Sequence, residues 1–342
     1  MAFLKNCWYA AAFSAEIGRA PMSRTILDMP LVFYRTQAGQ PVALGNRCPH
    51  RFAPLSEGKL FGDEIRCPYH GLRFAPDGKC VDNPCGNGKI PSAAKVASYP
   101  LRELDGIVWL WHGSEEPDES KIVRYEQFGQ RDEWAPAEFV LAIQANYMLV
   151  SDNLMDLTHA EFLHPQLAQE GFAKRSNPSV KQEGDQVISR NELPNEPISA
   201  LSRLSMGGAD APDHIDRTTV VTWNAPANIC IHMSDRPVGE PFERGAQFVA
   251  AHLITPESEK TCHYLFRVVR NWLPDNQDIS EKVRAAAYNA FTSEDEVMIE
   301  AQQRSMGNLT YEELRPALLG TDLAATLTRR ILNSKLQAQG AP

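Results

Sequence analysis

Two short segments, Cys48-Pro-His-Arg-Phe-Ala-Pro-Leu55 and Cys67-Pro-Tyr-His-Gly-Leu72, decide how the first half of the chain is organised. Each supplies one cysteine and one histidine, and sixteen residues separate His50 from Cys67. Cysteine and histidine in two short loops are typical of a metal centre, and zinc is the default metal for two of each. The spacing differs from that of a zinc finger, whose cysteines form one close pair and whose histidines form another.

An iron–sulfur cluster fits this pairing of ligands better than zinc does. In a [2Fe–2S] cluster of the Rieske type, two thiolates hold one iron and two imidazoles hold the other, which raises the reduction potential. We therefore expect Cys48, His50, Cys67 and His70 to bind such a cluster. Gly71 follows the last ligand directly and allows a close approach of the backbone.

The residues around these segments predict a β-rich first domain. The strand-like runs are residues 24–27, 31–35, 42–44 and 107–111. A chain of 342 residues is long enough for about two domains. The charged, proline-containing segment Glu115–Ser120 is a plausible linker, so we expect a cluster domain over residues 1–115 and a second domain over residues 116–342.

A second set of metal-binding residue types lies in the second half. The run from Asn153 to His164 contains two histidines, His159 and His164, on a helix-prone segment. On an ideal helix, side chains five residues apart point in directions that differ by about 140°. Both imidazoles can therefore reach one atom only if the helix ends or distorts. Pro165 disfavours helical geometry at His164, so we expect the helix to break there. Two histidines and one carboxylate on one face of an iron leave positions open for oxygen and substrate.

A helix predicted over residues 279–306 offers the carboxylate. Its apolar residues follow one stripe, made of Val283, Ala287, Phe291, Met298 and Ile299. Asp295 falls on that stripe, whereas Glu294 and Glu296 are expected to point elsewhere. A carboxylate on an apolar face needs a partner, and a metal ion is one. Periodicity alone leaves open that the stripe is misplaced by a residue and that Asp295 is solvated.

Together these motifs resemble those of the Rieske non-haem iron oxygenases, over essentially the whole chain. The similarity is to the O-demethylating branch, which includes the oxygenase components of vanillate and dicamba O-demethylases. Respiratory Rieske proteins carry two further cysteines at slots that Ala53 and Tyr69 occupy here, which disfavours that class. The resemblance implies an α+β fold, with an N-terminal Rieske β-sandwich followed by a helix-grip-like catalytic domain with a curved antiparallel sheet.

The same resemblance assigns roles to residues. It implies that His159, His164 and Asp295 hold a mononuclear Fe(II), with Asn153 supporting the ligands from behind. Asp156 stands one turn before His159 and is expected to hydrogen-bond that imidazole. In the family the matching aspartate reaches a cluster histidine of the neighbouring subunit, which makes Asp156 an electron bridge and implies a homotrimer. Either His50 or His70 is its expected partner.

The resemblance also predicts a reaction and a partner. The chain lacks a G-x-G-x-x-G fingerprint, so we do not expect it to take hydride from NADH itself. The resemblance implies a separate NAD(P)H-dependent reductase with a flavin and an iron–sulfur centre. The expected reaction is O-demethylation of a methoxylated aromatic acid, such as vanillate, to a phenol and formaldehyde with O2. The alternative is an aryl-methyl hydroxylase or another Rieske ring hydroxylase, acting on an aromatic acid or sulfonate. His252 and Asn228 are the candidate substrate contacts.

Composition excludes several other classes. The net charge of −9 argues against a general binder of nucleic acid. The longest uninterrupted apolar run is residues 107–111, too short to span a bilayer, and no signal peptide is evident. Seven sparse cysteines suit a reduced, cytoplasmic protein. Two other classes are a Rieske electron carrier and a zinc-binding interaction protein. The long second domain with His159, His164 and Asp295 argues strongly against the electron carrier. A red-brown colour separates the zinc protein from the Rieske proteins.

Overall fold

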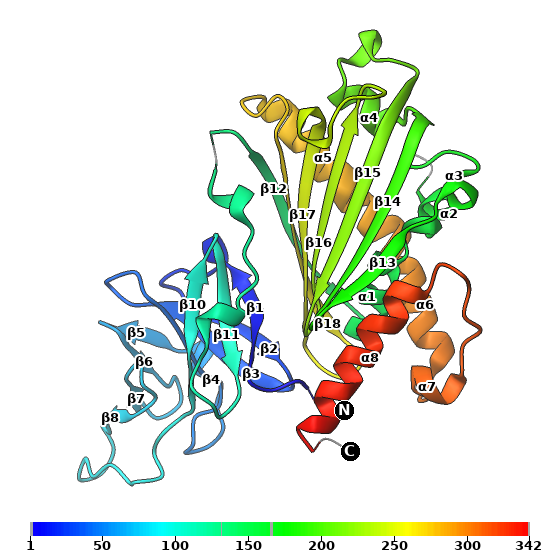
Figure 1. Cartoon of the computed structure of the whole chain (residues 1–342). Helices are drawn as coiled ribbons and strands as arrows, with labels where there is room; N and C mark the ends of the chain where they lie inside the picture. Colours follow the sequence, from blue (N-terminus) through cyan, green and yellow to red (C-terminus); the bar gives the residue numbers. More distant parts are fainter. Residues whose placement is uncertain (1–2, 131, 165–166, 341–342) are drawn as a thin grey trace. The chain divides into compact units, whose positions relative to one another are not determined.

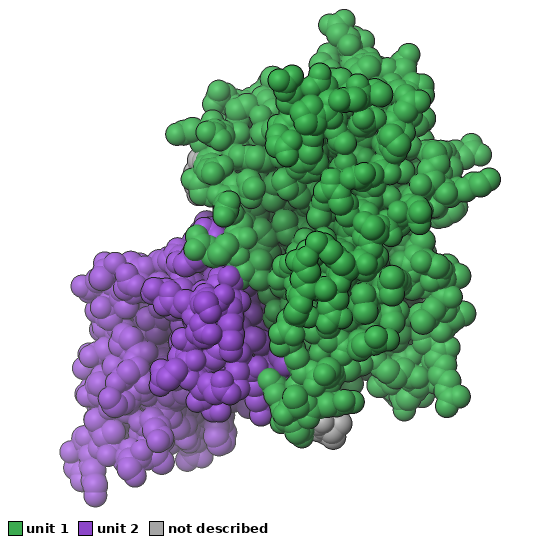
Figure 2. Space-filling model, viewed as in Figure 1, with its two compact units in different colours: residues 1–2, 123–254, 259–342 green, residues 3–122, 255–258 purple. Residues whose placement is uncertain are grey.

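The computed structural model describes residues 3–130, 132–164 and 167–340. The chain divides into two compact units (Figure 2). The first comprises residues 3–122 together with 255–258, and the second comprises the described residues of 123–254 and 259–342. The domain boundary expected after residue 115 stays a prediction.

The first unit consists of short strands in three small sheets (Figure 1). Its strands are β1 (Cys7–Phe13), β2 (Met22–Ile26), β3 (Met29–Arg35), β4 (Pro41–Gly45), β5 (Lys59–Phe61), β6 (Glu64–Arg66), β7 (Arg73–Phe74), β8 (Cys80–Asp82), β9 (Ser98–Tyr99), β10 (Leu101–Leu104) and β11 (Ile107–His112). The sheets have the orders β1-β11-β10, β2-β3-β4-β9 and β5-β6-β7-β8. Each pairing is antiparallel. The first cysteine–histidine loop lies between β4 and β5, and the second joins β6 to β7.

Strand β3 shows why this unit forms two layers of core. Successive side chains of a strand point to opposite faces. Leu31 and Phe33 pack into one apolar cluster with β1 and β11, whereas Val32 and Tyr34 pack into another beneath the cysteine–histidine loops. All four side chains are fully buried. The second cluster includes Cys48 and Cys67, so the predicted ligands sit on a packed core.

The second unit is a seven-stranded antiparallel sheet with helices. Its strands are β12 (Ala135–Ile143), β13 (Ser179–Glu183), β14 (Gln186–Pro197), β15 (His214–Asn224), β16 (Asn228–Arg236), β17 (Ala246–Pro256) and β18 (Cys262–Arg270). The order across the sheet is β12-β18-β17-β16-β15-β14-β13. Its helices are α1 (Tyr147–Met155), α2 (Ala160–Leu163), α3 (Phe172–Arg175), α4 (Ala200–Ser205), α5 (Gln277–Ala290), α6 (Glu296–Met306), α7 (Tyr311–Leu314) and α8 (Leu323–Ala338).

The helices of the second unit are placed by the sheet. Helices α1, α5 and α6 lie across one face, where α1 contacts β15 and α5 contacts β12, and α8 packs on β13 and β14 at the edge (Figure 1). The expected α+β fold class, with a β-sandwich Rieske domain followed by a helix-grip-like domain, is confirmed. Among the described residues, no helix has the length and apolar content needed to cross a bilayer.

Two of the expected helices are interrupted. The segment predicted as one helix up to His164 consists of α1, a 3-10 turn at Leu157–His159 and α2. The long helix predicted over residues 279–306 keeps its course, but its regular α-helical geometry is interrupted by a π-helical turn, Phe291–Asp295, which joins α5 to α6. Both interruptions lie next to predicted metal ligands.

Candidate metal centres and substrate cavity

The two cysteine–histidine loops have matching backbones. In the first, the N–H of Phe52 donates to the carbonyl of Cys48, and in the second the N–H of Gly71 donates to the carbonyl of Cys67. Phe52 and Gly71 both have positive φ, 59° and 79°. A Cβ on Gly71 would lie 2.8 Å from the ring of Pro84, so the sequence-based interpretation of this glycine as a point of close approach is confirmed.

The structure brings the four predicted cluster ligands together. Cys48 and Cys67 are buried. Burial is the main cause that raises the pKa of the Cys48 thiol to about 11, and the neighbouring Cys67 raises it further. The rings of His50 and His70 have centroids 4.4 Å apart, and His50 is exposed. Two buried thiols beneath two adjacent imidazoles match the ligands of a Rieske cluster, with the histidine side toward solvent.

Breaks in the helices position His159 and His164. Helix α1 ends at Met155, and the next residue, Asp156, has an extended backbone with φ −124° and ψ 96°. His164 follows α2 with φ −124° and ψ 72°, so it lies outside the helix, as expected from the proline after it. Pro165 itself lies outside the described residues. Because the helix ends, the two imidazoles need not keep the separation that ideal helical geometry would impose.

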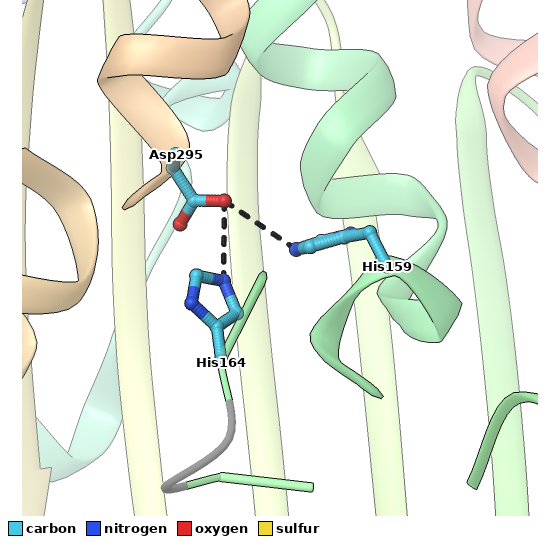
Figure 3. Close-up of side chains that lie close together, drawn as sticks. All are labelled: His159, His164 and Asp295. Atoms are coloured by element: carbon cyan, nitrogen blue, oxygen red, sulfur yellow. Dashed lines mark hydrogen bonds and ion pairs between the residues drawn. The ribbon is translucent and has the colours of Figure 1, made fainter. Parts of the chain in front are cut away.

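His159, His164 and Asp295 converge on one point (Figure 3). The Nε2 atoms of His164 and His159 lie 3.2 Å and 3.5 Å from Oδ1 of Asp295. One potential ligand atom from each residue falls within 4.8 Å of the others. This set could hold a divalent metal ion on one face, and two neutral imidazoles with one carboxylate are typical ligands of non-haem Fe(II).

The outer atoms of these side chains are also held. Nδ1 of His159 lies 2.6 Å from the backbone carbonyl of Asp156, and Nδ1 of His164 lies 2.5 Å from Oε2 of Glu294. Both partners are acceptors, so with a metal ion at the site each Nδ1 would carry the proton and each Nε2 would offer its lone pair to the metal. Asn153 donates from Nδ2 to Oδ1 of Asp295 over 3.0 Å, as expected of a supporting residue.

The surroundings of His164 favour a positive charge. Burial alone would lower the pKa of His164, but hydrogen bonds and charges from Asp295 and Glu294 raise that pKa above its ordinary value. The same carboxylates would stabilise a divalent metal ion at this point, because a negative carboxylate attracts a metal cation by the same Coulomb interaction as it attracts a protonated imidazole. The residues therefore fit an iron ion on electrostatic as well as geometric grounds.

Two expectations at this site were wrong. Glu294 does not point elsewhere, because the π turn is wider than an α turn and brings Glu294 and Asp295 to the same side. The carboxylate of Asp156 does not bond the imidazole of His159. Its Oδ1 instead accepts from the backbone N–H and the hydroxyl of Thr158, and only its backbone carbonyl faces the ring.

A cavity of about 260 Å³ adjoins the three converging side chains. Most of its lining is apolar, including Leu157, Phe172, Phe248, Phe266 and Phe291. His252 lies in the lining, whereas Asn228 does not line the cavity. Asn228 lies at the start of β16, paired with Asn224 and Leu253, so the structure does not bring it to this site.

His252 belongs to this apolar lining and has one ring nitrogen without a hydrogen-bond partner. Its Nδ1 lies 2.6 Å from the hydroxyl of Tyr264, and its Nε2 is buried without a hydrogen bond. Burial lowers the pKa of His252 to about 3 despite the opposing charge of Asp295, so the ring is neutral at ordinary pH. A buried ring nitrogen without a partner is suited to bind a polar atom of a ligand.

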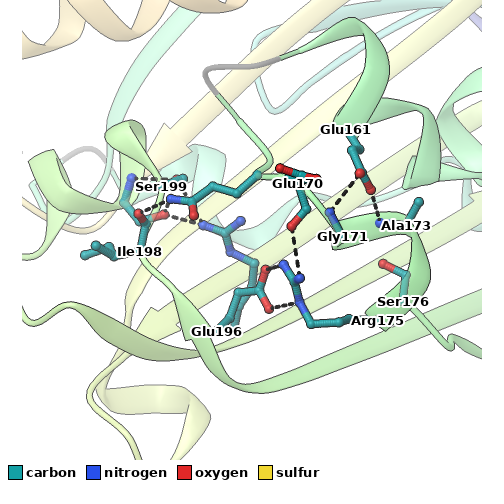
Figure 4. A network of polar contacts seen from close by, with 12 residues as sticks. Glu161, Glu170, Gly171, Ala173, Arg175, Ser176, Glu196, Ile198 and Ser199 are labelled. Carbon is teal, nitrogen blue, oxygen red and sulfur yellow. Dashed lines mark hydrogen bonds and ion pairs between the residues drawn. The ribbon is translucent and has the colours of Figure 1, made fainter.

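Polar contacts hold the cavity wall that follows His164 (Figure 4). The carboxylate of Glu161 accepts the backbone N–H groups of Gly171 and Ala173, each over 2.7 Å. Arg175 pairs with the buried Glu196, with Nη2 2.6 Å from Oε1. These contacts tie the short helix that contains Phe172 to β14, and so fix one side of the cavity.

Two family descriptions match the chain. A Rieske [2Fe-2S] domain matches residues 7–100, and a vanillate O-demethylase oxygenase C-terminal domain matches residues 143–338, more than half of the chain. The chain belongs to the Rieske non-haem iron oxygenases. The cofactors of this Rieske oxygenase are a [2Fe–2S] cluster and a mononuclear iron, which confirms the cofactor expectation.

Relatives of this Rieske oxygenase match it over nearly their whole lengths. It is 39% identical to the oxygenase component of chloroacetanilide N-alkylformylase from Rhizorhabdus wittichii, over 99% of this chain and 97% of that protein. It is 35% identical to the oxygenase component of dicamba O-demethylase from Stenotrophomonas maltophilia, over all of both chains. The crystal structure of dicamba monooxygenase bound to 3,6-dichlorosalicylic acid has a TM-score of 0.93, at 33% identity and full coverage of both chains.

Proposed function

We propose that this Rieske oxygenase is the terminal component of a multicomponent monooxygenase that dealkylates an aromatic substrate. In the proposed reaction, the alkyl carbon attached to oxygen or nitrogen is hydroxylated, and the unstable product releases formaldehyde when that group is methyl. The main support is the placement of His159, His164 and Asp295 at a largely apolar cavity. The names of the relatives, an O-demethylase and an N-alkylformylase, support the same type of reaction.

The geometry supports the proposed cofactor ligands. Cys48, Cys67, His50 and His70 would hold the cluster, and His159, His164 and Asp295 would hold the iron. When bound, the iron activates O2 with electrons that the cluster supplies one at a time.

The remaining residues of the site orient the ligands and the substrate. Glu294 and the Asp156 carbonyl fix the two imidazoles, and Asn153 fixes the carboxylate. The apolar lining excludes water, and Nε2 of His252 would bind one polar atom of the substrate. The expected acid group on the substrate has less support, because no described residue that lines the cavity carries an uncompensated positive charge.

We also propose that electrons cross between subunits of a homotrimer through Asp156. Its Oδ1 is occupied by Thr158, while Oδ2 has no hydrogen bond among the described residues. The carboxylate therefore has one oxygen available for an imidazole of a neighbouring subunit, either His50 or His70. Electrons would come from a separate NAD(P)H-dependent flavin and iron–sulfur reductase, because the sequence has no dinucleotide fingerprint of its own.

Formaldehyde release tests the proposed reaction. The purified iron-loaded oxygenase would be given O2, NADH, a compatible reductase and a panel of methoxyarenes and N-alkylated anilides that includes vanillate and dicamba. We expect formaldehyde in equal amount to the dealkylated product. Reductase-coupled oxygen uptake that yields a hydroxylated aryl-methyl product without formaldehyde would instead support the alternative, aryl-methyl hydroxylation.

A further inference from the structure

The sheet face that lines the cavity has few polar side chains. The antiparallel register places the partners Thr219 and Met233, and Ile231 and Ala250, on this face. The described residues of the sheet that line the cavity are Arg217, Thr219, Ile231, Met233, Phe248, Ala250, His252, Phe266 and Val268. Among these, Arg217 is the single side chain with a permanent charge.

Arg217 is already compensated within the protein. Its Nε and Nη2 lie 2.8 Å and 3.1 Å from the two carboxylate oxygens of Asp235, which is fully buried. Its Nη2 also donates to the hydroxyls of Ser199 and Ser202. A bidentate pair of this kind leaves no net charge, and most of the guanidinium donors are occupied. Arg217 is therefore not available to neutralise an anionic ligand.

The other polar groups offer no positive charge either. His252 is neutral, and its free Nε2 provides one hydrogen bond without a charge. At the iron site, the formal charges of Asp295 and Glu294 together equal the charge of a divalent ion. An anionic ligand would thus lose its hydration in a cavity with no counter-charge among the described residues, and buried unpaired charge is strongly disfavoured.

We infer that this cavity selects uncharged aromatic molecules, with one polar atom on Nε2 of His252, and rejects carboxylate and sulfonate analogues. That these molecules are dealkylated rests on the proposed function, whereas the selection against charge rests on Arg217, Asp235 and the apolar lining. A neutral imidazole can donate or accept at Nε2, so an amide or an ester oxygen can pair with it. A carboxylate oxygen can accept the same hydrogen bond, but it brings a negative charge that the lining does not compensate.

Equilibrium binding of matched ligand pairs tests this inference. The two members of each pair have nearly the same shape, but one is neutral and the other is an anion. The pairs are the 2-, 3- and 4-methoxybenzamides and the corresponding methoxybenzoates. Calorimetric titration into the iron-loaded protein, without oxygen or reductase, should show at least about a hundredfold tighter binding of the best amide, or about 2.8 kcal/mol at about 1.4 kcal/mol per tenfold. A benzoate that binds as tightly as its amide in any pair, or no detectable binding of any amide, overturns the proposal.

Two substitutions test whether an added positive charge in the cavity restores the binding of anions. Ile231 lies diagonally across from His252 on the lining face, because its partner Ala250 is two residues before His252. Ile231→Arg should raise the affinity for the benzoates at least about tenfold relative to the amides, whereas Ile231→Leu should keep the preference of the natural protein. If the arginine variant is too unstable to assay, the ligand pairs on the natural protein still decide the question.

The binding result and the proposed reaction can fail separately. If the preferred amide binds but releases no formaldehyde when reductase and O2 are added, the dealkylation proposal fails and the selection against charge stands. If formaldehyde forms efficiently from the benzoates, the selection against charge fails and the dealkylation stands.

Discussion

At the scale of single residues, His164 depends on a carboxylate at each ring nitrogen. Glu294 faces Nδ1 and Asp295 faces Nε2, at 2.5 Å and 3.2 Å. The two carboxylates have different tasks, since Asp295 shares the proposed metal and Glu294 sets which nitrogen is protonated. A residue that orients a ligand in this way influences metal affinity almost as strongly as the ligand itself.

Glu294→Gln should therefore weaken iron binding. Glutamine keeps the size of the side chain but lacks the charge that fixes the Nδ1 proton of His164. We expect iron(II) affinity to fall by about 10- to 100-fold with an unchanged cluster spectrum. Iron titration followed by metal analysis measures the effect, with Glu296→Gln as the matched control on the same helix. Equal iron affinity in the two variants would remove Glu294 from the support of His164.

His252 should make the folded protein less stable in mild acid. Its pKa falls from an ordinary value of 6.5 to about 3 because of burial. Below pH 6.5 the unfolded chain gains a proton that the folded chain does not take up, so stability is lost as the pH falls from 6.5 toward 3. This loss amounts to about 2 kcal/mol at pH 5. Urea unfolding at pH 7 and pH 5 should show a smaller pH effect in His252→Gln, and an identical effect in both proteins would contradict a neutral buried histidine.

At the scale of elements, the π turn Phe291–Asp295 determines the composition of the iron site. An α-helix through the same residues would turn by about 100° per residue and separate Glu294 from Asp295 on the helix surface. The wider turn lets both reach His164. Single π turns are rare and occur often at functional sites, which fits the position of this one.

Removal of one residue from this turn should abolish iron binding. Deletion of Thr292 would restore regular α-helical periodicity and rotate Asp295 relative to α5. We expect loss of the mononuclear iron with a retained cluster absorption spectrum, because the cluster ligands lie in the other unit. Thr292→Ala keeps the helix length and should retain iron. Iron bound at a normal level after the deletion would show that the π turn is not required.

Local patterns made part of this site predictable. The cluster motif and the break before Pro165 depend on neighbouring residues, so the sequence indicated them directly. The apolar stripe made Asp295 a candidate and the family resemblance selected it, although Met298 on the same stripe is 46% exposed. Glu294 was missed because regular α periodicity hides a π turn. The pair of Arg217 and Asp235 could not be predicted either, because it depends on the register between β15 and β16.

At the scale of the whole molecule, one chain carries an electron store and a reaction site in separate units. Residues 3–122 contain the four proposed cluster ligands, and residues 123–254 and 259–342 contain the three proposed iron ligands. If the proposed bridge through Asp156 joins different subunits, each iron receives its electrons from the cluster of a neighbouring subunit. A cyclic oligomer with head-to-tail contacts supplies every subunit with such a neighbour.

Mixed oligomers distinguish this arrangement from electron transfer within one chain. Subunits with His70→Cys would lack a working cluster, and subunits with Asp295→Ala would lack the iron, so neither should turn over alone. After unfolding, mixing in equal amounts and refolding with iron and sulfide, about half of the intact iron sites, or about a quarter of all subunit positions, should face an intact cluster across an interface. We therefore expect formaldehyde formation at about a quarter of the natural rate, and none from separately refolded samples combined afterwards. If the refolded natural protein is active but the mixture is inactive, electrons stay within one chain and Asp156 is not a bridge between subunits.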